Sequence, residues 1–256
     1  MIILFHCRNC FIRFLINLNH QHSIMNKTVA IFGMFISFCL SMQGQVKELN
    51  PISIIKMPTI SKAEYDRLSI LEDEGKLSEA EKKLMKECAI FDDLYSSSCS
   101  WYCGGDVLSI KDSSHLKATK KFNYNGKNAH NFNHESVWAE GAKGQGIGEY
   151  LEYVFSGGCP RITHVKILNG HVKDEKVWKD NSRVKKLKMY YMGKPYAILN
   201  LQDSRTEQDF EVGVLGPHNP EAPNWTLKFE IMEVYPGDKY TDTVISELWF
   251  DGIDVH

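Results

Sequence analysis

The chain has 256 residues, of which 43% are hydrophobic and 24% are charged. That balance is typical of a folded globular protein, and it excludes a disordered or collagen-like chain. A formal net charge of -2 lacks the basic excess of a dedicated nucleic-acid-binding protein, so we expect no nucleic-acid partner.

Residues 1–44 predict an over-long start followed by a secretory signal peptide. After Met25 come a basic residue, an apolar run over 28–40 and small residues at its end, which is the order that marks a signal peptide. We expect Met25 to be the working start and cleavage to leave Gln45 first. The mature chain would then be secreted, periplasmic or displayed at the cell surface, with no membrane span. An uncleaved signal anchor is the alternative, although the apolar run is short for a spanning helix.

Four cysteines remain after the predicted cleavage. Cysteines in an exported protein predict disulfide bonds, and four of them allow three connectivities. We expect at least one disulfide, and the sequence does not choose its partners. The candidates are Cys88, Cys99, Cys103 and Cys159.

Residues 45–105 predict a small helical region with a cysteine-containing loop at its end. Ser61 and Ser78 each precede a glutamate by three residues, which is the spacing of a capping box. Gly75 separates the two apolar patterns that follow, so we expect a helical hairpin. The hairpin offers a contact for a protein partner. A polar stalk with transient helix is the alternative.

Residues 106–256 change to an apolar period of two, which predicts strands. The alternation is clear over 149–155 and over 225–232, and turn signals such as Asn169-Gly170 separate at least seven such segments. No long amphipathic helix stands between them in the sequence. This part of the chain therefore predicts an all-β jelly-roll sandwich.

Motifs that would indicate catalysis or a cofactor are weak. The glycine-rich run 144–148 precedes a strand rather than a helix, so it does not match a dinucleotide-binding fingerprint. His130 and His134 are four residues apart but have no third ligand at a familiar distance, which disfavours zinc. The sequence also has no nucleophile elbow, zincin motif or convincing carboxylate pair. We expect no catalytic residues and no required cofactor.

Five segments, taken in order, resemble the NADase-type glycan-binding domain. That domain is a discoidin-like jelly roll (coagulation factor 5/8 type C, galactose-binding-like). The resemblance covers about 106–256 and implies a β-sandwich that recognises carbohydrate or a cell surface. It implies no NADase activity, because the catalytic domain of the related toxin is not matched here. The segments are Val137–Gly141, Gly144–Glu149, Asn169–Lys173, Asn181–Lys185 and Val234–Leu248.

A candidate glycan site follows from the aromatic and polar residues in and beside these segments. A sugar needs a flat aromatic ring for its apolar face and planar polar groups for its hydroxyls. The aromatic candidates are Trp178, Tyr240 and Trp138, and the polar candidates are Lys173, Asn181, Arg183, Glu140 and Asp242. Trp178 stands in a charged connection between strands, so we expect it to be exposed, whereas Trp138 is more typical of a core residue.

Many galactose-binding-like domains hold a structural calcium ion, and the resemblance implies ligands at Asn131, Ser136 and Glu247. The loop has Asn131-Phe132 where the family pattern has Asp-Gly. Hard cations prefer carboxylates, so this departure leaves a calcium-bound and a metal-free domain as open alternatives.

The sequence as a whole predicts an exported, non-catalytic module that binds a glycan or a cell-surface carbohydrate. The alternative is a protein-interaction or envelope-scaffold module that uses the helical hairpin as its contact. An unrecognised hydrolase is the third class. A glycan array distinguishes the first two classes, and incubation with NAD and general hydrolase substrates tests the third.

Overall fold

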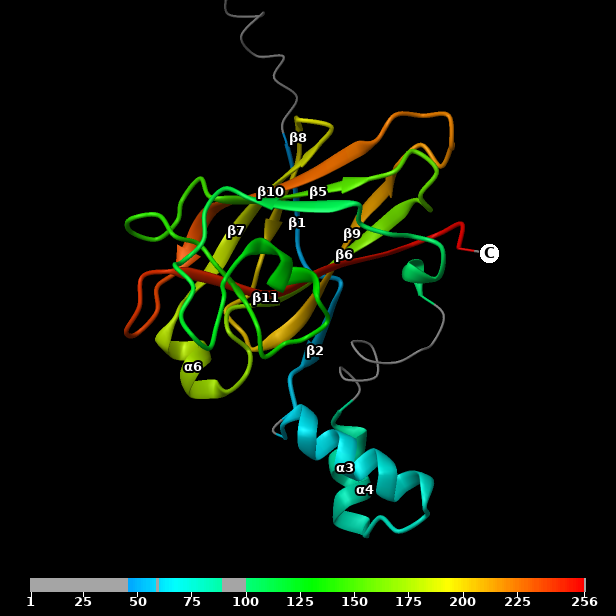
Figure 1. Cartoon of the computed structure of the whole chain (residues 1–256), viewed down its shortest axis with the longest axis vertical. Helices are drawn as coiled ribbons and strands as arrows, with labels where there is room; N and C mark the ends of the chain where they lie inside the picture. Colours follow the sequence, from blue (N-terminus) through cyan, green and yellow to red (C-terminus); the bar gives the residue numbers. More distant parts are fainter. Residues whose placement is uncertain (1–45, 59, 89–99, 256) are drawn as a thin grey trace, which may run out of the picture. The chain divides into compact units, whose positions relative to one another are not determined.

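The computed structural model describes residues 46–255, apart from residue 59 and residues 89–99. The predicted signal peptide and Cys99 lie outside the described residues. The described helices are α3 (Lys62–Asp73), α4 (Glu79–Lys86) and α6 (Glu175–Asp180), with the 3-10 turns η1 (Trp101–Cys103) and η2 (Gly126–His130) (Figure 1). None of these helices is long and apolar enough to span a bilayer. The strands are β1 (Lys47–Leu49), β2 (Ser53–Lys56), β3 (Ser109–Asp112), β4 (Trp138–Ala139), β5 (Tyr150–Phe155), β6 (Ile162–Asn169), β7 (Ser182–Tyr191), β8 (Lys194–Asn200), β9 (Thr206–Leu215), β10 (Trp225–Tyr235) and β11 (Thr243–Gly252).

The strands form a β-sandwich, which confirms the predicted fold class. One layer has the order β2-β9-β6-β11, and the other has β7-β10-β5-β3 with β8 on the free side of β7. β11 links the layers: it pairs antiparallel with β6 and, through Thr243 and Val244, in parallel with the start of β7. This link brings the N-terminal ends of β7 and β11 together, and the candidate site lies there.

The core follows from the alternation that the sequence predicts. Along β10, Trp225, Leu227, Phe229 and Ile231 are buried, while the residues between them are only partly buried. The buried face packs against rings from the neighbouring strands, and Phe155 stacks on Trp225 with the ring centroids 4.5 Å apart. Burial of each large apolar side chain contributes about 1.5–3 kcal/mol, so this alternation largely fixes which face points inward.

Two short strands lie in the region that the sequence predicts to be helical. β1 pairs in parallel with β8, and β2 pairs antiparallel with β9, so both extend the sandwich. Lys47 also connects β1 to β9, because its Nζ donates to the Val212 carbonyl at 3.0 Å. Strands of three and four residues are too short to show a period of two, which explains why the sequence did not reveal them.

The predicted helical hairpin is present as α3 and α4. The Ser61 side chain accepts a hydrogen bond from the backbone of Glu64, and Ser78 forms a complete capping box with Glu81. Arg67 joins the helices, because its guanidinium donates to Glu64 at 2.7 Å and to Glu81 at 3.1 Å. The caps satisfy helix N–H groups that would otherwise lack acceptors.

Candidate functional site

Trp178 is buried, and the expectation that it is exposed is wrong. It lies in α6, which begins where the Asp174 side chain accepts a hydrogen bond from the Val177 N–H at 2.8 Å. Only 6% of Trp178 is exposed, and it belongs to an apolar cluster with Trp249. Its Nε1 donates to the Asn169 carbonyl at 2.9 Å. The short helix turns the ring inward while its charged neighbours stay in solvent.

Arg183, a second candidate contact, lies at the start of β7 beside Trp178 and is 6% exposed. Its guanidinium forms a two-pronged ion pair with Asp203, at 2.7 and 3.1 Å. It also donates to the Asn181 carbonyl at 2.8 Å and lies 4.3 Å from the ring centroid of Trp178. These contacts use the planar donors of Arg183 within the chain, so its role in this structure is to hold α6, the start of β7 and Asp203 together.

Trp138 and Glu140, two further candidates, are also buried. Trp138 is a core residue whose Nε1 donates to the Ser114 carbonyl at 2.9 Å. The Glu140 carboxylate accepts the Thr243 N–H at 3.1 Å and the Ala142 N–H at 2.7 Å. Burial raises the pKa of Glu140, and these N–H groups oppose that rise. Glu140 therefore connects its own loop to the start of β11.

The glycine-rich run 144–148 packs on this buried carboxylate. Gly146 has a φ of +66°, and a Cβ at this position would lie 2.4 Å from Cγ of Glu140. Thr243 closes the loop from the other side, because its Oγ1 donates to the Gln145 carbonyl at 2.8 Å. The glycines thus allow a tight loop that leads into β5, and they do not form a phosphate-binding turn at the start of a helix.

Tyr240 is the aromatic candidate with an exposed ring, at 44%. It stands in the 236–242 loop, which lies beside α6 (Figure 1). Its backbone N–H donates to the Asp180 carbonyl at 2.8 Å, and its carbonyl accepts the Ser182 hydroxyl at 3.2 Å. The Lys239 ammonium lies 4.8 Å from the ring centroid. The loop is therefore anchored on the C-terminal end of α6 while its tyrosine faces solvent.

The close approach of this loop to α6 depends on Gly237. Its N–H donates to the Ser182 hydroxyl at 3.1 Å. A Cβ at this position would lie 2.4 Å from the Asn181 carbonyl carbon and 2.7 Å from the Asp180 oxygen. Both atoms belong to the backbone and cannot move aside alone, so a larger residue would displace the loop.

The structure therefore brings Tyr240 together with two of the polar candidates. Asn181 is half-buried beside the loop, and its amide donates to the Val177 carbonyl at 2.8 Å. Asp242 is half-buried at the end of the loop, and its carbonyl accepts the Ser182 N–H at 3.2 Å. Lys173 is exposed on the connection that leads into α6. Lys239 contacts Tyr240 and is not among the predicted site residues. Its position next to Tyr240 in a Pro-Gly turn is a sequence signal that predicts this contact.

Three of the four candidate cysteines lie among the described residues. Cys88 is buried, and its Sγ donates to the Leu84 carbonyl at 3.1 Å. Cys159 is also buried, with its Sγ 3.4 Å from the backbone nitrogen of Asp106 that donates to it. Cys103 is exposed. Because Cys99 lies outside the described residues, the predicted disulfide stays a prediction.

The residues expected to hold calcium lie together, but backbone N–H groups of the loop, and not oxygen atoms, face the Glu247 carboxyl group. Glu247 is buried, and the backbone N–H groups of Asn133, Phe132 and Asn131 face its carboxyl group, with the Asn133 nitrogen 2.7 Å from Oε1. Burial raises the pKa of Glu247 to about 8, against the lowering by these N–H groups. Calcium takes six to eight oxygen ligands. A loop that presents N–H donors does not fit that ion.

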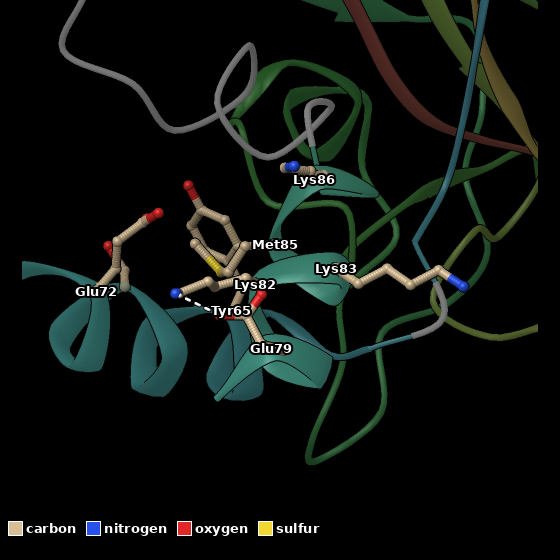
Figure 2. A pocket seen from close by; sticks show the side chains of 8 residues that line it. Tyr65, Glu72, Glu79, Lys82, Lys83, Met85 and Lys86 are labelled. Carbon is tan, nitrogen blue, oxygen red and sulfur yellow. Dashed lines mark hydrogen bonds and ion pairs between the residues drawn. The ribbon is translucent and has the colours of Figure 1, made fainter. Parts of the chain in front are cut away.

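A separate groove lies between α3 and α4, with a volume of about 630 Å³. Figure 2 shows its lining side chains: Tyr65 and Met85 provide apolar surface, and charged residues surround them. The Lys82 ammonium and the Glu79 carboxylate form an ion pair at 2.7 Å within this lining. None of the residues that the sequence predicts for glycan binding lines this groove.

A jelly-roll sandwich with its candidate contacts on loops at the strand ends is the architecture of discoidin-like, carbohydrate-binding-type modules. The family model of the NAD glycohydrolase translocation F5/8 type C domain matches residues 101–251, and the chain belongs to this family. No curated protein shows a match.

Solved structures similar to this chain include carbohydrate-binding modules from Clostridium perfringens. The CBM32-1 and CBM32-2 domains of ZmpB share 12% identity, with a TM-score of 0.42, over 64% of this chain and 38% of that chain. The same pair in complex with GalNAc shares 11% identity, with a TM-score of 0.42, over 75% and 50%. CpGH89CBM32-5 in complex with GalNAc-β-1,3-galactose shares 10% identity, with a TM-score of 0.39, over 56% and 94%. The chain thus spans well under half of the first of these structures.

Proposed function

We propose that this domain binds a glycan at the surface formed by α6 and the 236–242 loop. The exposed ring of Tyr240 carries the proposal, because the two tryptophans considered with it, Trp178 and Trp138, are buried. Membership of a family of carbohydrate-binding type supports the ligand class. A ring held by an anchored loop loses little freedom on binding, which favours affinity.

Polar groups around Tyr240 suit the hydroxyls of a sugar that stacks on the ring. Lys239 supplies an ammonium 4.8 Å from the ring centroid. The half-buried Asn181 lies beside this loop and the half-buried Asp242 ends it, so they are the further polar candidates. Lys173 and the other charged residues around α6 remain exposed for a larger glycan.

Tyr240→Ala is expected to weaken glycan binding tenfold to a hundredfold. Loss of a stacking ring costs about 1–3 kcal/mol, by analogy with other aromatic stacking sites, and 1.4 kcal/mol corresponds to a factor of ten in affinity. The measurement is a glycan array on the wild type, followed by titration of the best ligand into both proteins. The melting temperature should hardly change, because the ring packs in no apolar cluster of the described core.

Tyr190→Ala is a matched control for this experiment. Tyr190 lies on the solvent side of β7 with the Lys228 ammonium 4.0 Å from its ring centroid, so it also combines a tyrosine with a lysine. Its removal should leave the affinity unchanged. Equal affinity of Tyr240→Ala and wild type would place the glycan site elsewhere on the domain.

We further propose that the chain is exported and acts without catalysis. The export proposal rests on the order of residues after Met25, and it predicts a mature chain that begins near Gln45. N-terminal sequencing of the protein recovered outside the cytoplasm tests it; a mature chain that retains residues 1–24 contradicts it.

The proposal that the chain acts without catalysis has its own test. Incubation with NAD and general hydrolase substrates should show no turnover.

A second candidate function, protein binding through the helical hairpin, is favoured by the groove between α3 and α4. Its apolar surface at Tyr65 and Met85 and the 60% exposed Ile70 on α3 provide contacts for a protein surface. A glycan array without any bound sugar would favour this function over the first.

A further inference from the structure

We propose that the Asn131–Ser136 loop needs no metal ion, because the Glu247 side chain fills an anion-binding nest formed by the loop's own backbone. The nest lies where related domains hold calcium. The proposal concerns the structure of this loop and does not depend on the glycan site at Tyr240.

The backbone of the loop has the conformation that makes such a nest. Asn131 has φ -120° and ψ 7°, and Phe132 follows with a positive φ of 55°. A turn of this kind can direct successive N–H groups toward one point, which forms a concave site for an anion. Here the Asn133 N–H donates to Glu247 Oε1 at 2.7 Å, and the N–H groups of Asn131 and Phe132 lower the pKa of the same carboxyl group.

Most of the side-chain oxygen atoms that a cation would need, on Asn131, Ser136 and Glu247, are engaged with other groups. The Asn131 side-chain oxygen accepts the Asn133 N–H at 3.0 Å and the Ser136 hydroxyl at 3.2 Å. The same hydroxyl lies 3.0 Å from the Asn133 carbonyl. Of the Glu247 oxygens, Oε1 accepts the Asn133 N–H at 2.7 Å, and Oε2 is buried without a hydrogen-bond partner within the described part of the chain.

Phe132 shows how the loop keeps this shape. A non-glycine residue in the left-handed region is strained. The ring compensates through packing: it meets Tyr102 edge-on, with centroids 5.1 Å apart, and lies 5.7 Å from His130. The loop is therefore fixed by an internal carboxyl group on one side and by an aromatic cluster on the other, two contacts that act without an ion.

The first test is the melting temperature of the purified chain in 5 mM calcium chloride and in 5 mM EGTA. The proposal expects a difference below about 1 °C. A calcium ion at a hundredfold excess over its dissociation constant would instead raise the melting temperature by about 5–10 °C in a domain of this size. The comparison is made at pH 7.5.

Variants of Glu247 complete the test. Glu247→Ala removes the acceptor of the buried Asn133 N–H, so it should melt several degrees below the EGTA-treated wild type, with or without calcium. Melting equal to the EGTA-treated wild type would overturn the proposal. Glu247→Gln keeps one oxygen acceptor and serves if the alanine variant does not fold. A calcium-dependent rise in wild type that Glu247→Gln abolishes also overturns the proposal.

Glu135→Gln is the matched control, because Glu135 is an exposed acid in the same loop. It should melt like the wild type in both solutions. A calcium effect that persists in Glu247→Gln and disappears in Glu135→Gln would place a loosely held ion at the surface, and it would support a metal-free nest at Glu247.

Discussion

Trp178→Ala is expected to lower the free energy of unfolding by about 3–5 kcal/mol, as in other large-to-small changes of buried aromatic residues. The ring is 6% exposed, packs in the cluster that contains Leu168 and Trp249, and carries the guanidinium of Arg183 on its face. Its removal also leaves the Asn169 carbonyl without the Nε1 donor at 2.9 Å. Urea-induced unfolding, followed by circular dichroism, measures the loss.

Trp178→Phe is the matched control, because it keeps an aromatic ring and loses the indole N–H. It should lower the free energy of unfolding by about 1–3 kcal/mol, the range for a buried acceptor that loses its donor. If Trp178→Ala unfolded like the wild type and lost its glycan, the tryptophan would be a binding platform, and the burial argument would fail. The burial of Trp178 predicts that Trp178→Ala changes the free energy of unfolding and not the affinity for a glycan.

The sandwich could be predicted from the sequence because its signals are local. The alternation from Trp225 to Ile231 marks one buried face of β10, and the glycine turns mark the strand ends. The serine caps at Ser61 and Ser78 likewise mark both helices of the hairpin. Each of these signals depends on residues only a few positions apart, and side-chain periodicity translates them directly into which face is buried.

The candidate site could be predicted only in part, because its contacts join distant segments. Glu140 accepts a hydrogen bond from Thr243, which is 103 positions away, and this pairing makes the carboxylate a structural group. Trp178 lies in a helix of six residues, which is too short to show a helical period, so its charged neighbours misleadingly suggested exposure. Tyr240 is a candidate because a Pro-Gly turn with an aromatic residue is itself a local signal.

Arg183→Met is expected to lower the free energy of unfolding by about 3 kcal/mol, the lower end of the range for breaking a buried ion pair. The lower end applies because the Asp203 side chain is 38% exposed and water can solvate it once its partner is gone. Methionine keeps much of the apolar stem but cannot replace the donors to Asp203 and Asn181. Urea-induced unfolding again gives the measurement.

Arg183→Lys separates the two roles that Arg183 could have. Lysine keeps the charge but lacks the planar fork, so it cannot hold Asp203 with two bonds and still reach the Asn181 carbonyl. A stability loss close to that of Arg183→Met is therefore expected, with unchanged affinity of the folded protein for its glycan.

The double variant of Arg183→Lys and Trp178→Ala should lose less stability than the sum of the two single losses. The difference should be about 0.5–3 kcal/mol, because the guanidinium and the indole stabilise each other. Strict additivity, combined with a weaker glycan affinity of Arg183→Lys, would mean that Arg183 contacts the ligand instead.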